Sequence, residues 1–153
     1  MSDWQTPSRR TILAATALTG AALMLVPSEL SATPAQVEDE IKKLFAGRPM
    51  EEGKIKLDLP SIAESGLVVP LAFDVESPMT AADHVKRVVF FSEGNPNPVI
   101  AAYHFTPLIP KASGQMRIRL AQTQNVVAVA EMSDGKLYRT QREVKVTIGG
   151  CGG

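Results

Sequence analysis

The spacing of hydrophobic residues changes once along the chain, from a helical repeat to a repeat of two. Between residues 37 and 45, apolar residues recur every three or four positions, with acidic and basic residues between them. This spacing predicts one short amphipathic helix with a single apolar face. Thr33 and Gln36 have the spacing of a capping box before that helix, and Gly47 and Pro49 predict its end.

From Gly53 onward, apolar residues alternate with polar ones, which is typical of β-strands with one buried face. Turns rich in Gly, Pro, Asn or Asp separate the strand segments. The predicted strands cover residues 55–59, 69–75, 85–92, 99–105, 116–120, 126–132 and 137–148. The pattern predicts an all-β fold, an immunoglobulin-like antiparallel β-sandwich of about seven strands with a short N-terminal helix. A barrel of similar strand count is the alternative.

Two of these strands carry further information about their neighbours. Pro70 has no amide proton to give to an adjacent strand, so its strand is predicted to lie at the edge of a sheet. The strand at residues 85–92 is apolar on both faces, which predicts that it is central or covered by a partner. Val89 and Phe91, on its second face, are therefore the candidate partner surface.

Residues 1–35 are predicted to be an export signal. Arg9 and Arg10 precede an apolar stretch that is too short for a comfortable transmembrane helix. Paired arginines after a serine resemble a twin-arginine signal, which exports folded proteins, and this predicts a periplasmic location. Cleavage is expected after Ala32 or after Ala35, although either cut would disturb the capping box. An N-terminus that stays anchored in the membrane is the alternative.

Composition excludes several classes of function. Sixteen basic and sixteen acidic side chains balance, so no positive electrostatic field that would bind nucleic acid is expected. The length of 153 residues suggests one domain. No metal site and no cofactor is predicted, because the chain has one cysteine, two separated histidines and no phosphate-binding loop. His84 and His104 are expected to be structural or surface residues. Arg117 and Arg119 share a strand face, which is expected to be solvated rather than to hold an anion.

The only cysteine, Cys151, lies in a glycine-rich segment beyond the last predicted strand. Residues 36–148 are predicted to form the β-sandwich domain, and residues 149–153 a flexible arm that presents the thiol. The glycines of the arm are Gly149, Gly150, Gly152 and Gly153. At about 3.3–3.6 Å per extended residue, the thiol reaches roughly 10 Å past Ile148. The residues alone leave three readings open: a nucleophilic or carrier thiol, a disulfide between two chains, or a frayed terminus.

Four stretches of the chain carry a resemblance. The most specific is Val-Lys-Val-Thr-Ile-Gly-Gly-Cys-Gly-Gly at residues 144–153. The others are Asn-Pro-Asn-Pro at 95–98, Tyr-His-Phe-Thr-Pro at 103–107, and Val-Val-Ala-Val-Ala-Glu-Met-Ser-Asp-Gly at 126–135. Together with the export signal, they resemble the SoxY family, the sulfur-carrier subunit of the thiosulfate-oxidising Sox system. The resemblance covers most of the mature chain.

The resemblance implies a carrier protein and not an enzyme. It implies that Cys151 is the attachment site for sulfur intermediates, held as S-thiosulfonate or persulfide. A c-type cytochrome is expected to couple thiosulfate to the thiol, a hydrolase to release sulfate, and in some organisms a sulfane dehydrogenase to oxidise the remaining sulfur. SoxZ is expected as heterodimer partner, and the mature protein is expected to have no membrane contact. An exported structural domain that dimerises through a disulfide at Cys151 is the alternative.

Overall fold

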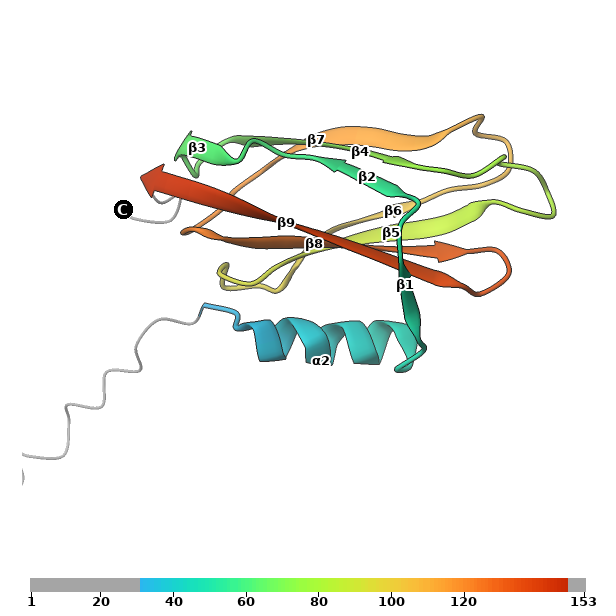
Figure 1. The fold of residues 1–153 in the computed structure, drawn as a ribbon, viewed down its shortest axis with the longest axis horizontal. Helices are drawn as coiled ribbons and strands as arrows, with labels where there is room; N and C mark the ends of the chain where they lie inside the picture. Colours follow the sequence, from blue (N-terminus) through green and yellow to red (C-terminus); the bar gives the residue numbers. More distant parts are fainter. Residues whose placement is uncertain (1–30, 149–153) are drawn as a thin grey trace, which may run out of the picture.

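The computed structural model describes residues 31–148, which form two packed β-sheets with a helix against the larger sheet (Figure 1). Most of the predicted export signal and the whole predicted arm lie outside the described residues. The elements are α2 (Pro34–Phe45), β1 (Met50–Glu52), β2 (Ile55–Asp58), β3 (Ile62–Ser65), β4 (Val69–Val75), β5 (Val85–Ser92), β6 (Val99–His104), β7 (Ala112–Ile118), β8 (Gln124–Met132) and β9 (Leu137–Ile148). Over these residues, the chain forms no helix of the length and apolarity that a membrane crossing requires.

The larger sheet has six strands, in the order β1-β9-β8-β5-β6, with β3 as a further neighbour of β9. β8 pairs with β9 in antiparallel fashion. The other edge of β9 is divided between two short parallel partners: β1 pairs with residues 137–139, and β3 with residues 145–148. The smaller sheet is antiparallel, in the order β2-β4-β7. The arrangement confirms the predicted all-β sandwich with a short helix before it.

All the predicted strands are present, and those at 69–75, 85–92 and 137–148 have the predicted bounds. The strand predicted at 116–120 begins earlier, at Ala112. β1 and β3 were not predicted. β1 has only three residues, and β3 begins with two adjacent apolar residues, so neither shows an alternation of apolar and polar positions.

An aromatic cluster fills the core between the two sheets. Phe73 of β4 packs against Phe90 of β5 and Tyr103 of β6, with ring centroids 4.9 and 5.0 Å away. Gly114 of β7 lies opposite Phe73. A Cβ atom on Gly114 would lie 2.9 Å from a carbon of the Phe73 ring, so the close approach of this ring requires glycine.

α2 covers the other face of the larger sheet (Figure 1). Val37, Ile41 and Phe45 of the helix pack in one buried cluster with Val89 and Phe91 of β5. The prediction that β5 is central in its sheet is confirmed. The prediction that Val89 and Phe91 form a partner surface is wrong, because they are 2% and 0% exposed. The apolar pattern identified the face but contained no information about which segment covers it.

Pro70 does not mark an edge strand, so that prediction is also wrong. β4 lies between β2 and β7. The pairing with β2 begins only at Ala72, whereas on the other side Pro70 lies opposite Arg117 of β7. The missing amide proton of Pro70 is therefore tolerated where β2 has already ended, on a strand that is central over the rest of its length.

The predicted capping box is present at the start of α2. The Thr33 hydroxyl accepts from the Gln36 N–H at 3.3 Å, and the Gln36 side-chain oxygen accepts from the Thr33 N–H at 2.8 Å. Ala32 is buried, and its N–H donates to the carbonyl of Asn95 at 2.7 Å. The packed domain therefore includes Ala32, and the boundary predicted between residues 35 and 36 falls inside the helix.

Two arginines join the other end of α2 to the larger sheet. Arg87 donates to the Leu44 carbonyl at 3.0 Å, and Arg48 to the Phe45 carbonyl at 3.1 Å. Both guanidinium groups also pair with the buried Glu131 of β8, at 2.6 and 2.7 Å. Burial raises the pKa of Glu131, but the hydrogen bonds and charges of the two arginines outweigh it and hold the pKa below its usual value. This ionised link between helix and sheet was not predicted from the sequence.

Candidate functional site

The candidate site is the end of β9 that leads toward Cys151. Cys151 and the glycines of the predicted arm lie outside the described residues, so their roles stay predictions. We call residues 144–148 the arm root. Because Cys151 is three residues beyond Ile148, covalent geometry limits its Cα atom to roughly 10 Å from the Cα atom of Ile148.

Backbone hydrogen bonds from β3 and the turn after it hold one side of the arm root. The Lys145 N–H donates to the Ser61 carbonyl at 3.0 Å. The Ile148 carbonyl accepts from the Gly66 N–H at 2.8 Å. These bonds extend the parallel pairing of β3 with β9 at both of its ends. The last described residue of the chain is therefore still bonded into the sheet.

The start of β8 holds the other side of the arm root. Val144 is fully buried and lies opposite Gln124, the first residue of β8. Beyond that point β8 no longer pairs with β9, and a side chain provides the next hydrogen bond: the Thr123 hydroxyl accepts from the Val146 N–H at 2.9 Å. The strand itself was predicted from the sequence, but Thr123 was not, because a threonine in a loop gives no signal of this kind.

Three large apolar side chains lie at the end of the arm root: Leu67, Val68 and Ile148. They are 52%, 60% and 67% exposed, respectively, and we call them the apolar rim. Leu67 and Val68 directly follow Gly66, whose N–H is bonded to the Ile148 carbonyl. Ile62 of β3 is 61% exposed but lies opposite Lys145, three residues before Ile148, so it faces the other side of the sheet and is not part of the rim. The sequence analysis missed this surface. Its only signal was the run Leu67-Val68-Val69. The sequence does not show that Val69 is buried while the two residues before it are exposed.

A hydrogen-bond network at the same end joins the turn between β5 and β6 to the loop before β8. The Asn95 side-chain oxygen accepts from the Ala121 N–H at 2.9 Å and from the Gln124 side chain at 3.1 Å. Gln124 in turn accepts from the Gly94 N–H at 2.7 Å. A Cβ atom on Gly94 would lie 3.2 Å from the Cβ atom of Gln124. The Asn-Pro-Asn-Pro stretch thus fixes the loop that contains Thr123.

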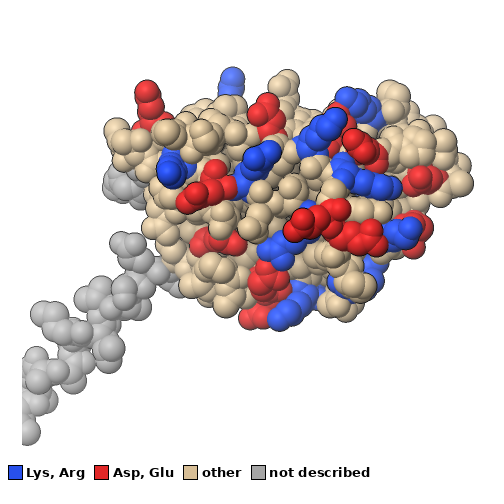
Figure 2. All heavy atoms as spheres, in the orientation of Figure 1, with Lys and Arg blue, Asp and Glu red and all other residues tan. Residues whose placement is uncertain are grey.

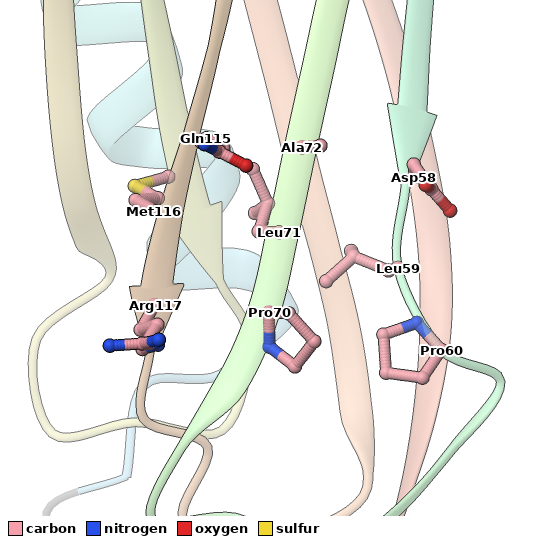
Figure 3. A pocket seen from close by; sticks show the side chains of 9 residues that line it. All are labelled: Asp58, Leu59, Pro60, Pro70, Leu71, Ala72, Gln115, Met116 and Arg117. Atoms are coloured by element: carbon pink, nitrogen blue, oxygen red, sulfur yellow. The ribbon is translucent and has the colours of Figure 1, made fainter.

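A groove of about 790 Å³ lies on the smaller sheet, beside the point where β2 leaves β4 (Figure 3). β2 pairs with β4 as far as Asp58, after which the chain passes to the larger sheet and forms β3. Pro60, Pro70 and Ala72 line the groove. Asp58 and Arg117 lie on opposite sides of it (Figure 3). The groove marks the crossing between the sheets, and the sequence analysis did not anticipate it.

The two histidines meet at the opposite end of the sandwich. His84 and His104 both line a hollow of about 520 Å³, together with Lys86 and Glu131. The Nδ1 atom of His84 lies 3.1 Å from the Thr80 carbonyl oxygen. Residues 31–148 contain no group of three or more His, Cys, Asp or Glu side chains placed to hold a metal ion. The fold therefore brings together two residues that the sequence analysis treated separately, far from the arm root.

Charged side chains of both signs are mixed over the face of the molecule shown in Figure 2. Arg117 and Arg119 are both exposed, which agrees with the predicted solvated strand face. This face therefore has the mixed character that the balanced composition predicts.

Known proteins resemble this chain in sequence and in fold. The family model described as "Sulfur oxidation protein SoxY" matches residues 41–151. The sulfur carrier protein SoxY from Chlorobium limicola f thiosulfatophilum is 34% identical with a TM-score of 0.64, and the match covers 74% of this chain and 98% of that one. A superoxide reductase (neelaredoxin) from Ignicoccus hospitalis, 20% identical with a TM-score of 0.56 over 76% of this chain and 95% of that one, shares the fold alone. Comparison with curated protein sequences gives no match.

Proposed function

The chain belongs to the SoxY family of sulfur oxidation proteins, and from this membership we propose that it carries sulfur intermediates covalently on Cys151. The observation that carries the proposal is the family match, which extends as far as Cys151. The similar protein from Chlorobium is described as a sulfur carrier. The geometry supports the proposal, because β9 is bonded on one side as far as Ile148 and on the other as far as Val146, which tethers the thiol to a fixed point of the domain.

The loading step joins the Cys151 sulfur to the outer sulfur of thiosulfate. The thiol gives up its proton, one sulfur–sulfur bond forms, and two electrons leave the pair. The product is a cysteine S-thiosulfonate. We propose a c-type cytochrome as the acceptor of these electrons. The thiolate is the reactive form of the cysteine, so loading is expected to require deprotonation in the enzyme that receives it.

The release step frees sulfate and leaves one sulfur on the carrier. Water attacks the sulfonate sulfur, the bond between the two thiosulfate sulfurs breaks, and sulfate, one proton and a cysteine persulfide result. We propose that a hydrolase catalyses this step, and that a sulfane dehydrogenase, where present, oxidises the persulfide further. The chain is then the covalent substrate of its partner enzymes and not an enzyme itself.

We propose SoxZ as the heterodimer partner. Because α2 covers Val89 and Phe91 of β5, SoxZ is expected to bind elsewhere on the domain. Within the described residues, β6 is one edge of the larger sheet, opposite the edge that β1 and β3 form, and no Lys, Arg, Asp or Glu lies between Val99 and His104. Uncharged edge strands are prone to pair with another strand. Ala102 is exposed on β6, and Ala102→Lys is expected to weaken the heterodimer in size-exclusion chromatography. An unchanged heterodimer would show that SoxZ binds elsewhere.

We also propose that Arg9 and Arg10 direct export to the periplasm and that the signal is cut upstream of Ala32. A cut after Ala32 would place an ammonium group on Thr33, beside the positive end of the helix dipole. A cut after Ala35 would remove the cap, which costs about 1 kcal/mol. Sequencing the N-terminus of periplasmic protein checks the cut. Precursor that is still exported after both arginines are changed to lysine would refute the twin-arginine route.

One peptide tests the carrier proposal. Lys145 is the final tryptic site, so digestion yields residues 146–153, in which the only sulfur atom belongs to Cys151. Protein isolated with thiosulfate and active cytochrome is expected to give this peptide with added sulfur or sulfonate that a reducing agent removes. Cys151→Ser is expected to keep the fold and to abolish thiosulfate-dependent turnover. If the peptide is always the bare thiol or a simple dimer, the structural disulfide replaces the carrier.

A further inference from the structure

We propose that the apolar rim is a docking surface for the enzymes that react with Cys151, and that these enzymes present apolar side chains around the entrance to their active sites. The rim consists of Leu67, Val68 and Ile148. The proposal rests on the proposed function, and it specifies which surface of the domain the partner enzymes share.

The length of chain between Ile148 and Cys151 brings any such enzyme onto the rim. Three residues span at most roughly 10 Å. The arm root cannot lengthen this tether without loss of structure, because the Ile148 carbonyl is bonded to the Gly66 N–H and Val146 to Thr123. An active site that encloses the Cys151 sulfur therefore has its outer wall within about one tether length of Ile148.

The rim covers the same span as this tether. Leu67 and Val68 follow Gly66 by one and two residues, so their Cα atoms lie within roughly 4 and 8 Å of its Cα atom. The Gly66 N–H is itself bonded to the Ile148 carbonyl, so all three rim residues lie within about one tether length of Ile148. The surface that an enzyme must approach therefore includes the surface formed by these three side chains.

The chemistry of this surface indicates apolar contact rather than charge attraction. The charged side chains of β3 and the arm root are Glu64 and Lys145, which are opposite in sign and give little net field. Exposed apolar side chains that are grouped are typical of binding sites. Because the backbone beneath them is already bonded into the sheet, docking requires little ordering of this part of the chain.

Charged substitutions at the rim, with a matched control at the far end, test the proposal. The test variant is Leu67→Glu with Val68→Glu. The control is Leu108→Glu with Ile109→Glu, two residues that are 93% and 40% exposed in the loop between β6 and β7. The measurement is the initial rate of thiosulfate addition to residues 146–153, with the loading cytochrome and limiting carrier. The test variant is expected to load at least tenfold more slowly, and the control at the wild-type rate. Alkylation of Cys151 by iodoacetamide is expected to stay unchanged in both.

The outcomes separate this proposal from the proposed function. If wild-type protein is never loaded, the carrier proposal fails and this one fails with it. If wild type and test variant load equally, only the docking surface is wrong. Sedimentation analysis shows whether the test variant still forms the heterodimer with SoxZ, or a homodimer where wild type forms one. If either association is lost, the rim binds SoxZ or a second copy of the chain, which also overturns the proposal. If circular dichroism shows that the test variant is unfolded, Leu67→Ser with Val68→Ser replaces it and is expected to give a smaller loss in the same direction.

Discussion

Two apolar surfaces of this domain differ in their exposure to solvent. Val89 and Phe91 of β5 are buried beneath α2, whereas Leu67 and Val68 of the apolar rim are more than half exposed. Both surfaces are built on strands or turns of the same sandwich. The first is covered by a helix from the same chain and therefore contributes to the stability of the fold. The second is left open beside the arm root, where we propose that it contributes to recognition.

The largest expected effect comes from removing a side chain at the covered surface. Phe91→Ala leaves a cavity between α2 and the larger sheet, and its expected cost is about 3–5 kcal/mol of the free energy of unfolding. Urea denaturation of the purified domain measures this. Leu67→Ala at the rim is the control and is expected to change stability by no more than about 0.5 kcal/mol. Equal losses in the two variants would remove the distinction between the surfaces.

The next effect concerns the ionised link that holds the end of α2 to the sheet. Glu131→Gln leaves Arg48 and Arg87 with a neutral partner. Because both arginines are partly exposed, we expect a loss of about 1–3 kcal/mol, less than for a fully buried pair. Thermal unfolding at neutral pH measures it. A loss below about 0.5 kcal/mol would mean that apolar packing alone holds the helix.

The same link predicts a pH dependence of stability. The pKa of Glu131 is lower in the folded protein than its ordinary value of 4.5. Its contribution is therefore complete above about pH 4.5 and is lost as the pH falls through the lower, folded-state pKa. The difference in melting temperature between wild type and Glu131→Gln is expected to shrink below that pH. A difference that stays constant in acid would contradict the assignment.

The smallest expected effect lies at the start of α2. Thr33→Ala removes the hydroxyl that accepts from the Gln36 N–H and is expected to lower the free energy of unfolding by about 1 kcal/mol. Thr33→Ser retains the hydroxyl and serves as the control. Hydrogen exchange sharpens the comparison of the two surfaces: faster exchange in α2, with no change in residues 144–148, is expected. Faster exchange in both segments would show that helix and arm root depend on each other.

The sequence predicted the parts of the fold that depend on local pattern. The alternation at residues 137–148 and the double-sided run at 85–92 became strands with those bounds. The covering of Val89 by α2 was not predictable in this way, because it depends on the packing of two segments far apart in sequence. The same limit applies to the apolar rim, which arises only when β3 lies beside β9. Cys151, by contrast, was predicted as the site from its glycine-rich surroundings and from a family resemblance, which are visible in the sequence alone. It lies outside the described residues, so its role stays a prediction.

The position of β9 has a consequence for the order of folding. This strand lies between β8 on one side and both β1 and β3 on the other, so its parallel partners are more than eighty residues earlier in the chain. Contacts of such long sequence separation slow the folding reaction, and sandwiches that depend on them fold in about milliseconds to seconds. During synthesis, residues 50–65 therefore wait for the segment 137–148 before the larger sheet closes. Until then β1 and β3 have unpaired edges, which makes the unfinished chain a substrate for chaperones.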